Sequence, residues 1–311
     1  MLKSFFSALA FFAAAVALPA QQNTIQNLYD AFGYEKKGTV LDWGYSALIH
    51  FNGKTILFDA GANGDLFARN AKAAGTDLRK IDFAVLSHKH GDHASGFDYV
   101  LQVNPSLKLY LPNDPSLGAG MGLPLPEVPK ELLASLPPEQ LYYRGQPKKA
   151  SGAWGPRFWR ANSEFVAAGK EAGPGVFLIA TRSPLIGDFS RYPPNATQPM
   201  LLGTPELSLA LVTSKGVILV TGCSHSRVEA IITEAKKALQ KDIYLVVGGF
   251  HLLPYSEAEI RKVATTMKRE LGVERVAPAH CTGMLGFKIF KEIFGADYLY
   301  AGLESTIDFP R

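Results

Sequence analysis

The residues best suited to chemistry stand in one short stretch, residues 87–93, which reads SHKHGDH and follows the apolar run IDFAVL. His88 and His90 are two residues apart, so an extended backbone points both imidazoles to the same side. Gly91 then allows a sharp turn, after which Asp92 and His93 can reach a neighbouring point. Four ligand-type side chains at this spacing predict metal binding, with two ligands for one ion and two for another.

Three more histidines follow other β-rich runs of the sequence. His225, His251 and His280 close the segments VTGCSH, VGGFH and APAH, whereas His50 lies inside the run ALIHF and is predicted to be an ordinary strand residue. Loops at strand ends are the places where a rigid sheet can bring side chains to one point. We therefore expect the histidines at strand ends to converge on the same site as the SHKHGDH stretch.

The two cysteines, Cys223 and Cys281, each stand beside one of these histidines, in TGCSHS and PAHCTG. A disulfide between them would be ordinary in an exported protein. Their histidine neighbours instead favour a role in metal binding or beside a metal ligand. For Cys281 a free thiol and a small buried hydrophobic residue are the alternatives.

The elements that must position these residues alternate between strands and helices. We predict strands within residues 38–60, with a hairpin at Asn52-Gly53, and at 81–87, 107–112, 175–181, 206–222, 243–250 and 274–280. We predict helices at about 66–74, at about 227–239 and from Ser256, where Glu259 completes a capping box. This order favours two sheets packed against each other with helices outside, an α/β sandwich.

Several motifs together resemble a known superfamily. SHKHGDH matches the H-x-H-x-D-H signature of the metallo-β-lactamase superfamily, and ILFDAG, which contains Asp59, is similar to its upstream Asp-Gly motif. The resemblance covers residues 38–305 and implies an αββα sandwich with one or two metals at the edge between the sheets. GYSALIHFNGKTILFDAG, TGCSHS, GGFHL and APAHCTG resemble the branch named for dihydropterin ribofuranosylaminobenzene phosphate synthase.

The resemblance also implies roles for the matching positions. It assigns His88 and His90 to the first metal, and Asp92, His93 and His280 to the second.

One departure from the superfamily pattern affects the ligand set. Most members end a strand with a metal-bridging aspartate, where this chain has Gly222-Cys223-Ser224-His225. Either the Cys223 thiolate or the His225 imidazole must replace it, and we expect His225 to be the ligand with Cys223 close by. His251 is expected to contact a ligand or the substrate, and Asp59 to orient a ligand histidine.

The resemblance implies a metal-dependent hydrolase. Two divalent ions, with zinc favoured and manganese or iron as alternatives, would share a hydroxide that attacks an ester, lactone, amide or phosphodiester, with Asp92 as ligand and orienting residue. A transferase or synthase of the branch type and a non-catalytic metal-binding protein are the alternatives. The sequence has no G-x-S-x-G, P-loop or G-x-G-x-x-G motif.

Residues 112–174 are rich in Pro and Gly and are predicted to form a cap or insertion over the core. Within this range the aromatic and basic residues suit a flat or anionic ligand or the packing of the cap; they are Trp154, Arg157, Phe158, Trp159 and Arg160. Glu206, ahead of the second hairpin, either faces the site or is a solvated turn carboxylate.

The N-terminus predicts export. Residues 1–20 contain Lys3, an apolar run and small residues suited to cleavage after Ala17 or Ala20, as in a secretory signal peptide. Residues 21–311 are then a single periplasmic or secreted domain without a membrane span. The net charge of +4 is mild and no basic run stands out, so we expect a small-molecule substrate rather than a nucleic acid.

Overall fold

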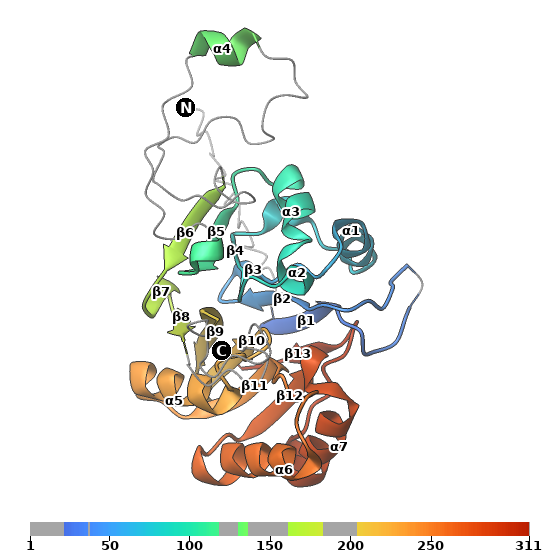
Figure 1. Ribbon diagram of the computed structural model, residues 1–311, viewed down its shortest axis with the longest axis vertical. Coiled ribbons are helices and arrows are strands. Elements are labelled where there is room, and N and C mark those ends of the chain that lie inside the picture. Colours follow the sequence, from blue (N-terminus) through green and yellow to red (C-terminus); the bar gives the residue numbers. More distant parts are fainter. Residues whose placement is uncertain (1–21, 37, 118–129, 136–160, 183–203, 311) are drawn as a thin grey trace, which may run out of the picture.

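A computed structural model describes residues 22–36, 38–117, 130–135, 161–182 and 204–310 of the protein (Figure 1). In these ranges two β-sheets face each other, and helices cover the outer face of each sheet (Figure 1). The predicted α/β sandwich is therefore confirmed. No helix in the described ranges is long and apolar enough to cross a membrane.

The first sheet has the strand order β13-β1-β2-β3-β4-β5-β6. Its strands are β1 (Thr24–Tyr29), β2 (Ser46–Phe51), β3 (Lys54–Phe58), β4 (Phe83–Val85), β5 (Lys108–Pro112), β6 (Asn162–Val166) and β13 (Thr306–Asp308). β2 and β3 form the predicted hairpin, and Asn52 and Gly53 both have positive φ there, 49° and 76°. β3 to β6 run parallel, so their carboxyl ends lie along one edge of the sheet.

The second sheet has the strand order β12-β11-β10-β9-β8-β7. Its strands are β7 (Lys170–Gly173), β8 (Val176–Thr181), β9 (Glu206–Thr213), β10 (Gly216–Thr221), β11 (Ile243–Gly249) and β12 (Arg275–Ala279). β10, β11 and β12 are parallel neighbours, so the loops that follow them leave the sheet at the same edge. These loops carry Cys223, His251 and His280.

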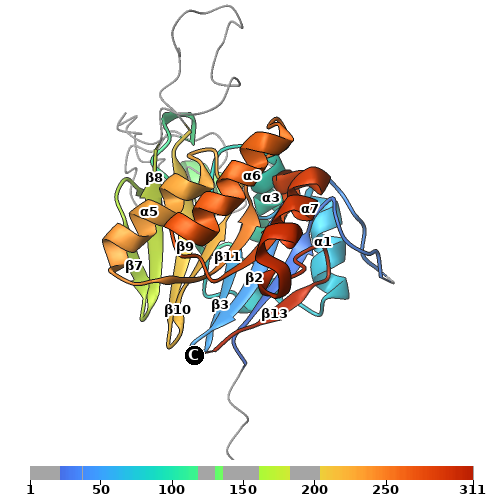
Figure 2. The ribbon, with the colours of Figure 1, turned by 90° about the horizontal axis from the view of Figure 1, so that it is seen from below.

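The helices lie mainly on the outer faces of the sheets. They are α1 (Gly64–Ala73), α2 (Gly91–Ala94), α3 (Phe97–Val103), α4 (Lys130–Ser135), α5 (Val228–Leu239), α6 (Glu257–Thr265) and α7 (Gly283–Phe294), with short turns η1 (Leu78–Lys80), η2 (Pro115–Leu117), η5 (Thr266–Glu270), η6 (His280–Thr282) and η7 (Gly295–Asp297). Figure 2 shows α5, α6 and α7 across the second sheet. At α6 the predicted capping box of Ser256 and Glu259 is present.

The core between the sheets is built from alternating strand residues. Ile49 and Val85 of the first sheet and Leu209, Val220 and Leu245 of the second are all buried in this layer. Burying each aliphatic side chain of this size stabilises the fold by roughly 1.5–3 kcal/mol. The layer therefore holds the two sheets, and with them the loops at their edges, in a fixed relation.

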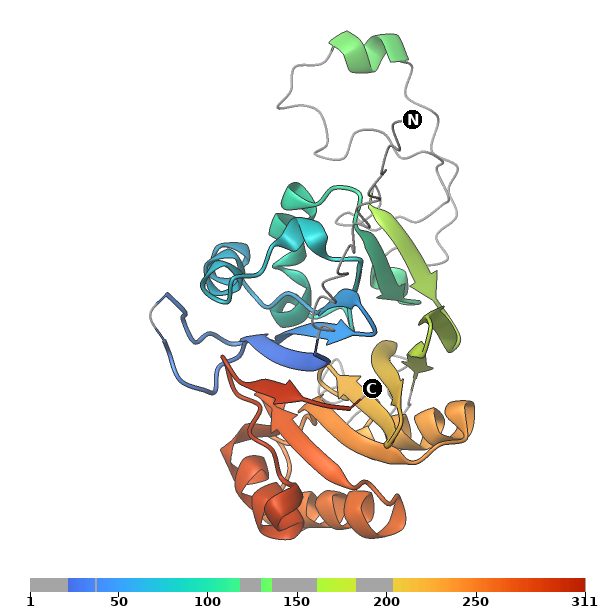
Figure 3. The ribbon, with the colours of Figure 1, turned by 180° about the vertical axis from the view of Figure 1, so that it is seen from behind.

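Some elements differ from the sequence predictions. Strands β1 and β13, which pair in Figure 3, and helices α3 and α7 were not predicted. Helix α7 contains Gly283 and Gly286, and glycine is a weak helix former, which hides the helix from propensity arguments.

The predicted cap range also needs a correction. Residues 162–173, which the sequence placed in the cap, form β6 and β7 at the ends of the two sheets. Much of the remaining cap range lies outside the described residues, as do the predicted signal peptide and the candidate ligand-binding residues, namely Trp154, Arg157, Phe158, Trp159 and Arg160.

Candidate metal centre

The candidate site lies where loops from both sheets meet. The first sheet contributes the loops after β3 and β4, and the second contributes the loops after β10, β11 and β12. Gly222 follows β10 and has no room for a side chain, because a Cβ there would lie 2.1 Å from Ser87 Oγ of the other sheet. This close approach lets side chains from the two sheets gather at one place.

Three imidazoles form what we call the first group: His88, His90 and His225. One ring nitrogen from each lies within 4.8 Å of the others. His88 Nε2 is 3.1 Å from His90 Nδ1, and the ring of His225 is centred 4.7 Å and 4.6 Å from those of His88 and His90. Burial, helped by the neighbouring imidazoles, lowers the pKa of His88 well below its usual value and that of His225 to about 2. The first group is therefore neutral at ordinary pH.

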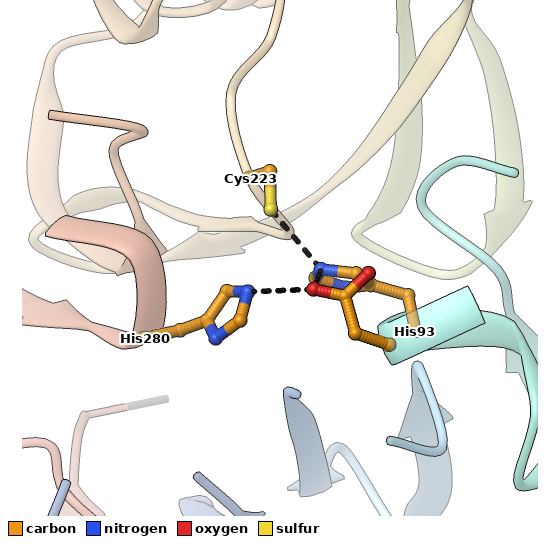
Figure 4. Close-up of side chains that lie close together, drawn as sticks. His93, Cys223 and His280 are labelled. Carbon is orange, nitrogen blue, oxygen red and sulfur yellow. Dashed lines mark hydrogen bonds and ion pairs between the residues drawn. The ribbon is translucent and has the colours of Figure 1, made fainter. Parts of the chain in front are cut away.

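Four side chains form the second group: Asp92, His93, Cys223 and His280. Their ligand atoms also lie within 4.8 Å of one another. His93 Nε2 is 3.1 Å from Cys223 Sγ, and Asp92 Oδ2 is 3.3 Å from His280 Nε2. Figure 4 shows His93, Cys223 and His280 pointing toward one another from α2, the loop after β10 and the end of β12.

The carboxylate of Asp92 gives the second group a negative charge. Burial raises the pKa of Asp92, but the neighbouring imidazoles of His280 and His93 outweigh burial and hold that pKa far below its usual value. The second group thus combines a carboxylate, two imidazoles and a thiol, a donor set that suits a divalent ion.

Asp59 connects the two groups through hydrogen bonds. It has a φ of 56° directly after β3, and its Oδ2 lies 2.6 Å from His93 Nδ1. The same carboxylate accepts hydrogen bonds from the backbone N–H and hydroxyl of Ser87, both at 2.7 Å, and Ser87 Oγ is 2.9 Å from His88 Nδ1. Asp59 therefore orients one histidine directly and a second through Ser87, leaving the opposite ring nitrogens to face the site.

Glu206 holds the loop that carries His225. It is buried, and its two carboxylate oxygens accept hydrogen bonds from the backbone N–H groups of His225 and Ser226 at 2.8 Å and 2.6 Å. Burial raises the pKa of Glu206 to about 7. The alternative of a solvated turn carboxylate is therefore wrong: Glu206 is buried behind the site and positions a candidate ligand.

The structure places Cys223 and His225 in different groups, an arrangement that the sequence did not anticipate. The two side chains do not compete for one position, because His225 belongs to the first group and Cys223 to the second. Ser224, between them, has a φ of 63°, so the backbone turns and sends its two neighbours to different places.

The remaining predicted candidates lie beside these groups or away from them. The His251 ring is centred 4.2 Å from that of His225, and its backbone N–H donates to Cys281 Sγ at 3.3 Å. Cys223 and Cys281 are both buried free thiols. His50 is in β2, with Nδ1 3.2 Å from Thr55 Oγ1, and belongs to neither group.

Unsatisfied nitrogen atoms test whether the groups suit metal ions. Among the described residues, His225 Nε2 and both ring nitrogens of His280 are buried without a hydrogen-bond partner. A buried polar atom left without a partner costs about 1–3 kcal/mol. Ligation of a cation by His225 Nε2 and by one ring nitrogen of His280 would remove that cost, so the donor set and its geometry fit metal binding.

Backbone strain concentrates in the same loops. Five non-glycine residues hold a positive φ there: Asp59 (56°), Ser224 (63°), Arg227 (69°), His251 (50°) and His280 (47°). Such conformations cost of order 1–3 kcal/mol each and persist where the surrounding structure enforces them. The strain indicates that the loops are shaped for the site rather than for their own stability.

Two residues that the sequence did not indicate support His280. The buried carboxylate of Asp30 accepts a hydrogen bond from the His280 backbone N–H at 3.1 Å, and burial raises the pKa of Asp30 to about 6. The Trp43 ring is centred 4.7 Å from the His280 ring and stays 43% exposed. Neither residue stands in a recognisable motif, whereas Ser87 could have been found from its place before His88.

Comparison with known proteins agrees with this geometry. Residues 44–139 match the family model of the metallo-β-lactamase superfamily. Two proteins of Methanocaldococcus jannaschii are 28% identical: a 7,8-dihydropterin-6-methyl-4-(β-D-ribofuranosyl)-aminobenzene-5'-phosphate synthase, over 80% of this chain and 83% of the relative, and the uncharacterized protein MJ0448, over 89% and 98%. The solved structure of Tm1679, described as a metal-dependent hydrolase of the β-lactamase superfamily, is 26% identical with a TM-score of 0.66, covering 93% of this chain and all of Tm1679.

Proposed function

We propose that this protein is a metal-dependent hydrolase, because residues 44–139 match the family model of the metallo-β-lactamase superfamily. It acts on a small molecule with an ester, lactone, amide or phosphodiester bond and uses two divalent ions, with zinc favoured. The structure of Tm1679, described as a metal-dependent hydrolase, supports the proposal through its similarity over nearly the whole chain.

One observation carries the proposal. Seven side chains from loops of two sheets divide into two adjacent groups, and the ligand atoms within each group lie within 4.8 Å of one another. The first group offers three nitrogens, and the second offers nitrogen, oxygen and sulfur. Catalytic zinc sites keep a position open beyond about three protein ligands, and the first group has the number of protein ligands that such a site uses.

Asp92 and Asp59 have separate roles in the proposed hydrolysis. Two divalent ions, when bound, lower the pKa of water and polarise a carbonyl or phosphoryl oxygen of the substrate. Asp92 stays ionised because its pKa is far below the usual value, so its carboxylate can bind a cation and accept a hydrogen bond from the attacking water. Asp59 keeps His93 in one orientation during the reaction.

A synthase or transferase is the second candidate. The similarity to the M. jannaschii synthase favours it. Such an enzyme would hold an acceptor at the site and keep water from it, so its products would contain the acceptor.

A substrate panel with metal analysis tests the proposal. The purified protein should carry about two metals per chain by elemental analysis and should hydrolyse one class among esters, lactones, amides and phosphodiesters. A chelator should abolish that activity, and His50→Ala, in β2 outside both groups, should keep metal and activity. Products that form only with an added acceptor would instead establish a synthase, and metal binding without turnover of any substrate would oppose an enzymatic role.

A further inference from the structure

A third set of possible ligand atoms lies next to the second group. It consists of the sulfur atoms of Cys223 and Cys281 and a ring nitrogen of His251, all within 4.8 Å of one another. Cys281 and His251 belong to neither the first nor the second group, so the roles proposed above leave them unused. Cys223 is common to the second group and to this set, which we call the thiol group.

The backbone brings the thiol group together through parallel strands. β10, β11 and β12 are neighbours, and the loops after them carry Cys223, His251 and Cys281 respectively. Gly249 ends β11, and a Cβ there would lie 2.8 Å from Cys281 Sγ, so a larger residue would push the thiols apart. The Gly249 backbone N–H donates to the carbonyl of Gly222 at 3.0 Å, which ties the β11 loop to the residue before Cys223.

Hydrogen bonds fix Cys281 within this arrangement. Its Sγ accepts from the His251 backbone N–H at 3.3 Å, and its own thiol faces the carbonyl of Cys223 at 3.6 Å. The Cys281 carbonyl accepts hydrogen bonds from the backbone N–H groups of Leu252 and Leu253. These contacts fix the sulfur atom of Cys281 beside His251 and the loop that carries Cys223.

We propose that Cys281, His251 and Cys223 bind a thiophilic cation such as Cu(I), at a position separate from the first and second groups. Two thiolates and an imidazole, with no carboxylate among them, are a soft donor set that prefers Cu(I) to hard ions. Cys223 belongs to both sets, so its sulfur would be shared between this cation and a metal of the second group when both are bound. Occupation of the thiol group therefore acts on the metal centre through a shared sulfur.

The three members of the thiol group differ in their exposure. His251 is only partly buried, and it lines a small pocket together with His225, Arg227 and Tyr255. The two cysteines lie almost fully buried behind it, at 3% and 2% exposure. Of the three side chains of the thiol group, His251 is therefore the one closest to solvent.

The test is Cu(I) transfer in the metal-loaded full-length protein. The protein is titrated without oxygen against the coloured Cu(I) complex of bathocuproine disulfonate, and loss of colour reports uptake. Wild type should take up one equivalent, and Cys281→Ser should weaken binding at least about tenfold. His251→Asn should have the same effect and should fold, because His251 has a φ of 50° that asparagine tolerates.

Met284 provides a matched control. Its thioether is another soft donor near Cys281 in sequence, on helix α7, and is 76% exposed, so Met284→Leu should not change Cu(I) uptake. No uptake by wild type, or undiminished uptake in His251→Asn, would overturn the thiol group as a site.

Zinc measured in the same samples tests whether Cys223 is shared. Retention of both zinc ions supports a shared Cys223, and loss of one zinc per Cu(I) bound contradicts it.

Discussion

The first and second groups differ in how they would balance the charge of a metal ion. The first group consists of three imidazoles, which supply no negative charge. Because burial lowers the pKa of its members, the group is neutral. The second group contains the Asp92 carboxylate and the Cys223 thiol beside two imidazoles. A cation placed in a buried site is costly unless opposite charge accompanies it. We therefore expect the second group to hold its metal more tightly, and stepwise chelation to empty the first group before the second.

Removing the negative charge of the second group should have the largest effect on metal binding and activity. Asp92→Asn keeps the shape of the side chain but loses the carboxylate, so the second metal should be lost and activity should fall at least about 100-fold, beyond what loss of an outer contact costs. Elemental analysis and kcat/KM measure both effects. If Asp92→Asn keeps two metals and loses its activity, charge balance is not what distinguishes the groups.

Two single substitutions test the first and second groups one at a time. His225→Ala should lower metal affinity at the first group, and Cys223→Ser at the second, each by at least about tenfold because a ligand atom disappears. In the cobalt-substituted protein, a sulfur-to-metal charge-transfer band should be absent from Cys223→Ser and present in His225→Ala. A band that survives in Cys223→Ser would remove sulfur from the second group.

Substitution of Asp59 should have a smaller effect on metal affinity. Asp59→Asn should weaken metal binding by about 10 to 100-fold, because His93 loses the carboxylate that sets its orientation and basicity. The second group should lose more affinity than the first, since the first is reached only through Ser87. Competitive titration with a chromophoric chelator measures the two affinities, and equal losses would show that Asp59 serves both groups alike.

The smallest expected effect concerns acid and the metal-free protein. His225 has a folded-state pKa of about 2, below its ordinary value of 6.5, so the folded state binds a proton less readily than the unfolded state. Its contribution to stability is therefore full above pH 6.5 and falls as the pH decreases below that value, by about 1.4 kcal/mol per pH unit. In chelator-treated protein, the urea-unfolding stability of wild type relative to His225→Gln should fall with acidification, and parallel pH profiles would contradict the buried neutral imidazole.

Much of the site could be predicted because its chemistry is local in sequence. The spacing in SHKHGDH placed His88 and His90 together and Asp92 beside His93, and the ends of strands located His225 and His280. The separation of Cys223 from His225 could not be predicted, since it depends on the positive φ of Ser224, a non-glycine residue. Asp30 was missed because its partner, the His280 backbone N–H, is 250 residues away.

The fold shows the same division between local and distant signals. Turn and capping signals at Asn52-Gly53 and at Ser256 act within a few residues, and these predictions are confirmed. Strand β13 has three residues and exists through its pairing with β1, so no local pattern announces it. Long-range pairing is where reasoning from a single sequence loses its physical basis.

The pairing of β1 with β13 joins segments that are far apart in the sequence. Thr24 pairs with Asp308, and Asn27 donates a hydrogen bond to the carbonyl of Ala301, so the last strand completes the sheet that begins the chain. Contacts between such distant segments form slowly and only after both have been made. The SHKHGDH ligands emerge from the ribosome long before His280. A growing chain therefore holds only part of the candidate ligand set, and the first and second groups are complete only late in folding.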